Sequence, residues 1–264
     1  MSPSQLGHSS FGYSSFRRLL TAVALSAVLI PAGAFGAERV WTQTYSLSSG
    51  GSLSLSNING DVTIRGTDRA DVSVTATITS DSESGLDRVD VKVDTSSNHI
   101  QIETDYSKKK GRWGNSGASV HYELEVPSSI ELEEIDLVNG SLQLSDIDGD
   151  VEANLVNGSL NAEGLGGSAE LETVNGQISA TFNRMGSSQR VDLESVNGSI
   201  ELRIPDDAGA TVEASTVHGK IRNDFGMKVE RGEYVGSDME GKIGDGGARI
   251  SLENVNGSIN VRRP

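Results

Sequence analysis

A short string, Val-Asn-Gly, returns along the second half of the chain and constrains the fold more than any other feature. From Asn139 the steps between copies are 18, 18, 22, 21 and 38 residues, and the last is close to two ordinary steps. Units repeated at such a period are typical of proteins in which successive coils stack and complete one another's core. The copies begin at Val138, Val156, Val174, Val196 and Val255, with an earlier relative at Ile58 and a His-containing variant at Val217.

The segments between the copies alternate between apolar and polar residues. Leu142 and Leu144 flank Gln143, and a second glycine, such as Gly149, lies midway between copies. Strict alternation predicts strands with one buried and one exposed face. Each repeat of 18–22 residues therefore holds two turns and two short strands, and we expect an all-β chain built as a β-solenoid.

The Asn of each copy is expected to form a structural ladder. Asn and Gly both accept the left-handed backbone of a tight turn, and His is also enriched in that conformation. Side-chain amides in successive coils can bond to one another along the axis. Six steps at about 4.8 Å predict a rod of roughly 30 Å for this part. The expected ladder residues are Asn139, Asn157, Asn175, Asn197, His218 and Asn256.

Two features of the repeats suggest a glycosylation site and a calcium site, but each has a simpler explanation. Asn139-Gly140-Ser141 and similar copies match the N-glycosylation pattern, but turn chemistry accounts for every copy. Asp146, Asp148 and Asp150 faintly resemble a calcium loop. They lack the EF-hand spacing and its distal Glu, so a solvated acidic turn explains them and we expect no metal site.

Residues 38–264 are predicted to form one domain. Residues 38–127 are less regular but still alternate as strands do, whereas residues 128–264 hold the regular coils. The stretch 81–85 is typical of a loop or a single helical turn.

Residues 1–36 have the pattern of a secretory signal peptide. Two arginines precede the apolar run Leu19–Ile30, and small residues follow it. This run of 12 residues is too short for a spanning helix, which needs roughly 20. Cleavage after Ala34 and cleavage after Gly36 both fit. No later stretch could span a membrane and there is no Cys for a lipid anchor, so we expect a periplasmic or secreted protein.

Composition excludes several classes of function. The chain has no Cys and only four His, and its formal net charge is −15. Thiol chemistry and disulfides are therefore excluded, and so acidic a chain repels nucleic acid and anionic membranes. We expect no catalytic residues, no cofactor and no nucleic-acid partner.

A basic cluster interrupts this acidic sequence within residues 106–119. It could be a contact loop for an anionic polymer or a lipid head group. The simpler interpretation, which we favour, is a solvated hairpin tip with its tryptophan folded back on a sheet. The candidate contact residues are Lys108, Lys109, Lys110, Arg112 and Trp113.

Several short motifs follow one another in a characteristic order. Besides the Val-Asn-Gly-Ser coils, they are Asn59–Ile64, Tyr122–Pro127, Gly219–Phe225, Gly241–Gly247 and Val255–Ile259. This order resembles that of the bacterial β-strand-repeat family labelled domain of unknown function 4097, or "putative adhesin", and the resemblance covers residues 45–262. The resemblance implies a right-handed β-helix-like fold in an envelope protein, and it brings no catalytic residues with it.

Three functions fit these observations. The first is a non-enzymatic binding, adhesin-like or scaffold module of the cell envelope, whose partner is an unidentified envelope component or protein. The second is a ligand-sensing or regulatory domain in envelope stress signalling. The third is a polysaccharide-active enzyme, which needs clustered carboxylates. The carboxylates here, such as Asp192, Glu194, Glu201 and Glu213, are dispersed on outward strand positions, where solubility and edge protection explain them. The sequence does not indicate an oligomeric state.

Overall fold

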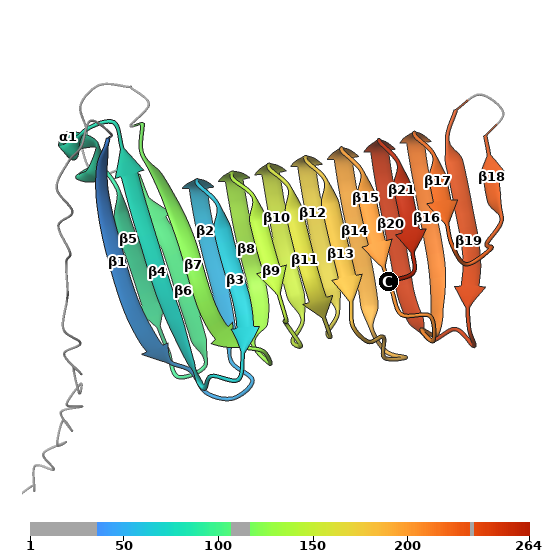
Figure 1. Cartoon of the computed structure of the whole chain (residues 1–264), viewed down its shortest axis with the longest axis horizontal. Helices are drawn as coiled ribbons and strands as arrows, with labels where there is room; N and C mark the ends of the chain where they lie inside the picture. The colour runs from blue at the N-terminus through green and yellow to red at the C-terminus, as the bar shows by residue number, and fades with distance from the viewer. Residues whose placement is uncertain (1–35, 107–116, 233–234) are drawn as a thin grey trace, which may run out of the picture.

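The computed structural model describes residues 36–106, 117–232 and 235–264. Within these ranges the chain forms strands β1–β21 and one short helix, α1 (Glu83–Leu86), which confirms the all-β prediction. The strands lie side by side in two layers along the long axis of the molecule (Figure 1). The expected signal peptide and the basic cluster Lys108–Trp113 lie outside the described residues.

The first layer, sheet A, is mixed and has ten described strands. Its N-terminal end is antiparallel, whereas the remaining neighbours are parallel. In spatial order its strands are β1 (Ala37–Ser46), β4 (Asp71–Ser80), β7 (Ser119–Pro127), β3 (Val62–Thr67), β9 (Leu142–Ser145), β11 (Leu160–Leu165), β13 (Ile178–Phe182), β15 (Ile200–Arg203), β21 (Ile259–Arg262) and β17 (Ile221–Asn223).

The second layer, sheet B, is also mixed and has eleven described strands. Antiparallel pairs occur at both of its ends, with parallel pairs between them. In spatial order its strands are β18 (Val229–Arg231), β19 (Ser237–Ile243), β16 (Ala210–His218), β20 (Ala248–Asn256), β14 (Arg190–Asn197), β12 (Ala169–Asn175), β10 (Val151–Asn157), β8 (Glu131–Asn139), β2 (Ser52–Asn59), β6 (His99–Asp105) and β5 (Asp90–Thr95).

Each regular repeat gives one strand to each sheet, in the same register as its neighbours. In sheet B, Leu171 of β12 lies opposite Ala153 of β10 and Leu193 of β14. The residues that alternate toward the inside are aliphatic, and Leu171 and Leu202 are completely buried. Burial between the two inner faces is therefore what holds the layers together, since no single repeat could enclose its own apolar face.

The spatial order of the coils differs from their order in the sequence. The last coil, β20–β21, lies between β14–β15 and β16–β17, so Asn256 pairs with both Asn197 and His218. Four steps, rather than six, separate Asn139 from Asn256 along sheet B. They span only about 19 Å at ~4.8 Å each, so the prediction of roughly 30 Å was wrong.

The antiparallel pairing of β16 with β19 accounts for this spatial order. One edge of β16 pairs with β19, in which Ser237 lies opposite Thr216. The remaining edge of β16 is then the only place on that strand where β20 can pair. Val235-Gly236-Ser237, which falls near the expected position of a further coil, instead leads into the antiparallel strand β19. The 38-residue gap in the repeat is thus no missing coil.

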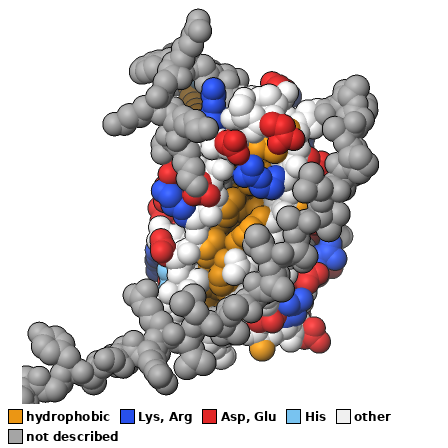
Figure 2. Space-filling model, turned by 90° about the vertical axis from the view of Figure 1, so that its left-hand side faces the viewer, with side chains coloured by type: hydrophobic (Ala, Val, Ile, Leu, Met, Phe, Trp, Pro, Cys, Tyr) orange, Lys and Arg blue, Asp and Glu red, His pale blue; other side chains and the backbone are white. Residues whose placement is uncertain are grey.

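The N-terminal end of the stack exposes part of the core. Strands β1 and β5 are the edge strands here, and their side chains Trp41, Tyr45, Val91 and Val93 are half-buried against the core. Seen from this end, apolar side chains form a strip with charged side chains beside it (Figure 2). None of the helices in the described ranges is long and apolar enough to cross a membrane.

Candidate binding groove

The Asn side chains of successive coils form a hydrogen-bonded ladder. Each Nδ2 donates to the Oδ1 of the Asn in the neighbouring coil at 2.9–3.0 Å. His218 lies in register beyond Asn256 and ends the row. The ladder runs through Asn59, Asn139, Asn157, Asn175, Asn197 and Asn256.

The expected left-handed turn conformation is wrong for the Asn and His of the string. Among the described residues, Asp146 is the only non-glycine with a positive φ. Asn175, like its equivalents, is the last residue of an extended strand. Glycine is needed next for a different reason, because a Cβ on Gly176 would lie 1.8 Å from the carbonyl oxygen of Gly158 in the neighbouring coil. Close stacking of backbones therefore selects the glycine, and at Gly60, Gly158 and Gly257 a positive φ favours glycine as well.

The ladder predicts slow deamidation of Asn157 and Asn175. Deamidation of an Asn-Gly pair needs the following backbone nitrogen to reach the side-chain carbonyl carbon, and both amides are held in hydrogen bonds on two sides. At mildly alkaline pH these two residues should deamidate much more slowly in the folded protein than in the same protein held in denaturant. Peptide mass spectrometry measures both rates, and equal rates would show that the ladder does not restrain the side chains.

The acidic turn that faintly resembles a calcium loop is engaged in other contacts. Asp148 pairs with Arg184 at 2.7 Å, and Asp150 Oδ1 accepts a hydrogen bond from the backbone N–H of Ser168. No group of three or more potential metal ligands occurs anywhere in the described ranges.

A row of exposed aliphatic side chains runs across sheet B next to the Asn ladder. These are the valines of the repeat string, and each is about 40% exposed. They lie on neighbouring strands in register, so the row follows the long axis of the molecule. In spatial order the row is Ile58, Val138, Val156, Val174, Val196, Val255 and Val217.

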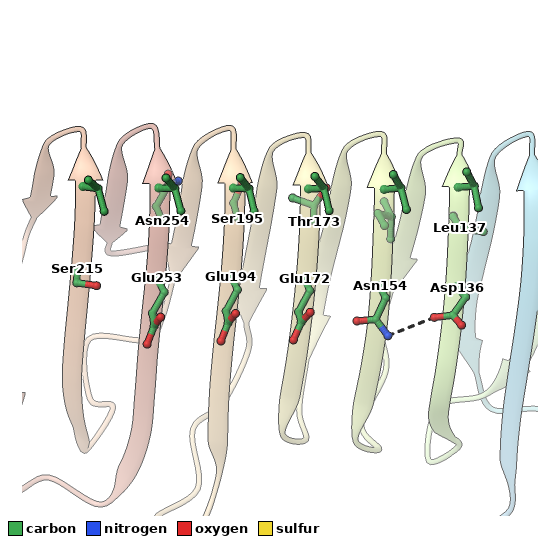
Figure 3. Close-up of a pocket in the computed structure, with 17 residues that line it drawn as sticks. Asp136, Leu137, Asn154, Glu172, Thr173, Glu194, Ser195, Ser215, Glu253 and Asn254 are labelled. Atoms are coloured by element: carbon green, nitrogen blue, oxygen red, sulfur yellow. Dashed lines mark hydrogen bonds between the residues drawn. The ribbon is translucent and has the colours of Figure 1, made fainter.

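A second row, which is mostly acidic, runs beside the valines. It lies two residues earlier on each strand and therefore on the same outer face. Glu172, Glu194 and Glu253 lie directly opposite one another on β12, β14 and β20, and their side chains form a line in Figure 3. At one end of the row, Asn154 Nδ2 donates to Asp136 Oδ1 at 3.2 Å.

The two rows line one shallow groove. It has a volume of about 540 Å³ and reaches from Asp136 on β8 to Val217 on β16. The valines supply its apolar surface, and they lie between the carboxylates and the strand ends. The groove thus combines an apolar strip with a parallel line of negative charge.

The carboxylates of the groove repel one another. Partial burial, and then the neighbouring Glu172 and Glu253, raise the pKa of Glu194 above its ordinary value. Within the described ranges no ion pair includes Glu172, Glu194 or Glu253. On sheet A, by contrast, Glu201 pairs with Arg203 at 2.6 Å. Like charges one strand apart destabilise a sheet, so this line is a place where the protein carries an electrostatic cost.

This cost predicts a pH-dependent gain in stability for Glu194→Gln. The folded-state pKa is raised, so ionisation disfavours the folded state; the cost is present at neutral pH and vanishes as the pH falls toward about 4. The variant should gain less than about 1 kcal/mol in free energy of unfolding at pH 7 and match the parent in acid. Urea unfolding measures this.

The matched control for that variant is Glu123→Gln on sheet A, since Glu123 lies opposite Thr63 and Thr75 rather than other carboxylates. An equal gain in the control, or a gain that persists in acid, would contradict the repulsion.

A histidine cluster joins three strands at the N-terminal part of sheet B. His99 Nδ1 lies 2.9 Å from Ser52 Oγ and 3.3 Å from Glu133 Oε2, and its Nε2 lies 3.2 Å from Ser54 Oγ. Ser54 is itself buried beneath these contacts. The cluster therefore links β2, β6 and the start of β8.

Sequence reasoning missed the valine row, although the signal was present. In Leu171-Glu172-Thr173-Val174 the inward side chains are Leu171 and Thr173. Continuing the same alternation places Val174 outside. The carboxylates were predicted to be dispersed, but the shared register of the repeats brings the Glu of several coils into one line.

Comparison with known proteins shows the family of the chain. Residues 128–262, more than half of the chain, match the sequence profile of the family described as Toastrack DUF4097. The chain belongs to this family. The match begins at the regular coils of the Toastrack chain and covers all the residues that line the groove.

Several solved structures are similar to the Toastrack chain in outline. One is described as a putative cell adhesion protein from Clostridium sporogenes, at 16% identity and a TM-score of 0.48, covering 86% of this chain and 100% of that one. A putative adhesin from Bacteroides fragilis has 11% identity and a TM-score of 0.33, covering 88% and 100%. A putative lipid binding protein from Parabacteroides distasonis has 14% identity and a TM-score of 0.25, covering 85% and 96%. No curated protein matches the sequence.

Proposed function

We propose that this Toastrack chain is an exported, non-enzymatic binding module of the cell envelope, adhesin-like or a scaffold, located in the periplasm or secreted. In this proposal the two-sheet stack is a β-solenoid that acts as a rigid support. The observation that carries the proposal is the groove on sheet B, in which an exposed valine row adjoins a line of carboxylates. Contiguous exposed apolar surface with a polar rim is typical of an interaction site.

The carboxylates themselves favour binding over catalysis. Paired-carboxylate catalysis uses neighbouring groups whose pKa values are pushed apart. In sheet B, partial burial and neighbouring carboxylates raise the pKa of both Glu152 and Glu194 in the same direction. Rows of equivalent charges fit the recognition of a partner that is itself extended along the axis. Buried Ser54, covered by His99, likewise supports a structural role for that cluster.

The test is binding of the purified protein to separated envelope fractions, namely peptidoglycan, outer-membrane lipid and envelope proteins. The informative variant is Val174→Thr/Val196→Thr/Val255→Thr, which keeps the side-chain shape and removes the apolar surface. We expect saturable binding to one fraction and its loss in the variant. Retained binding would place the site outside the groove, and no binding to any fraction would overturn the envelope role.

A further inference from the structure

The two rows of the groove have a fixed spacing that a partner must match. Neighbouring strands of a sheet lie about 4.8 Å apart, so both the valines and the carboxylates recur at that interval. Residues on the same face of an extended strand recur at about 6.6 Å, whereas successive turns of an α-helix recur at about 5.4 Å. A helix lying along the groove therefore follows the rows better than an extended chain does.

The length of the groove sets the length of that helix. Five strand intervals separate Val138 on β8 from Val217 on β16. These intervals span about 24 Å, which corresponds to roughly 16 residues of helix at 1.5 Å per residue. The groove thus matches a helix of ordinary length.

The carboxylates of the groove favour a positively charged partner. Glu172, Glu194 and Glu253 form one line on the groove wall, and in the described part of the chain no cation pairs with them. A basic side chain placed over this line would relieve the repulsion that, after partial burial, contributes to the raised pKa of Glu194. A second copy of a chain with net charge −15, or an anionic lipid surface, would increase it.

We infer that the groove binds a basic amphipathic helix of another protein, with the apolar stripe of the helix on the valine row and its Lys or Arg residues beside the carboxylate row. This inference rests on the proposed function and names the class of partner. Helix-in-groove recognition of this kind uses apolar anchors at successive turns, and flanking charges set orientation and specificity.

Fluorescence anisotropy with defined peptides tests the inference. The probe is a labelled 16-residue Leu/Lys peptide whose Leu residues recur at helical spacing. Two comparison peptides are an isomer of the same composition with strictly alternating Leu, and a Leu/Glu counterpart. We expect the first peptide to bind the full chain and to gain helicity by circular dichroism, and we expect the other two to bind at least about tenfold more weakly.

Two matched triple variants separate the groove from general charge. Glu172→Gln/Glu194→Gln/Glu253→Gln should weaken binding of the helical peptide by at least about tenfold. Glu123→Gln/Glu163→Gln/Glu201→Gln, which removes the same charge from the outer face of sheet A, should leave binding within about twofold. The Val→Thr triple variant should also weaken binding.

Each contrary result overturns a stated part of the inference. Equal binding of the alternating isomer would exclude a helix, and equal weakening by both Gln variants would reduce the effect to unspecific charge attraction. If no peptide binds while an envelope fraction binds in a valine-dependent way, the inferred partner is wrong and the proposed function stands. If neither peptide nor any fraction binds, both fail.

Discussion

A chain that ends at Gly247 is expected to lose cooperative folding of its C-terminal half. The truncation removes β20 and β21, which lie inside both sheets rather than at their ends. Leu252 and Ile259 are completely buried there. β16 pairs with β19 on one edge and with β20 on the other, so the truncation would remove its pairing toward β14 and leave it joined to β19. We expect residues 204–243 to be unprotected in hydrogen exchange and sensitive to limited proteolysis, while coils β8–β13 remain protected.

Two substitutions within β20 serve as controls for the truncation. Leu252→Asp should reproduce its effect, because it places a charge between the sheets. Arg249→Asp introduces the same residue on the exposed face of the same strand and should leave folding unchanged. A truncated chain with native protection throughout would mean that β16 packs directly on β14 and that the last coil is dispensable.

Leu171→Asp is expected to lower the free energy of unfolding by at least about 4 kcal/mol. Leu171 is completely buried between the two sheets, so the substitution removes packed methyl groups and buries an unpaired carboxyl. Urea unfolding followed by circular dichroism measures the difference, and failure to obtain folded protein is the extreme form of the expected result.

Glu170→Asp is the matched control for this second prediction. It introduces the same residue one position away, on the exposed face of the same strand, and should change stability by no more than about 0.5 kcal/mol. Equal stability of Leu171→Asp and the parent protein would show that the inner and outer faces are reversed.

Local alternation made much of this architecture predictable. The period of two assigns an inner and an outer face to each strand, and residues such as Leu171 and Leu202 are buried as that period requires. The same rule predicts the outward valines once it is followed to the end of the strand. The valine row was missed because valine is an apolar residue, and an apolar residue in a short turn motif does not by itself indicate an exposed position.

The order of the coils could not be obtained in this way. Every copy of the string offers its neighbours the same backbone, the same Asn and the same Gly, so a copy can stack on any other. The deciding contact is the antiparallel pairing of β16 with β19. The repeat string does not determine the register of this pair. The pairing depends on the relative energies of alternative strand pairs, which the sequence pattern does not indicate. The groove depends on the same choice, because Glu194 faces Glu253 only when β20 lies beside β14.

The interchangeable contact between coils also bears on how such a chain can evolve. Gly158 stacks on Gly140 in the same way that Gly176 stacks on Gly158, so an in-frame duplication of one repeat unit creates no new kind of interface. Each duplicated unit would lengthen the groove by one strand spacing, about 4.8 Å, with its own valine and acidic position. The number of repeats among relatives should therefore vary by duplication of single repeat units, and the length of the groove should vary with it.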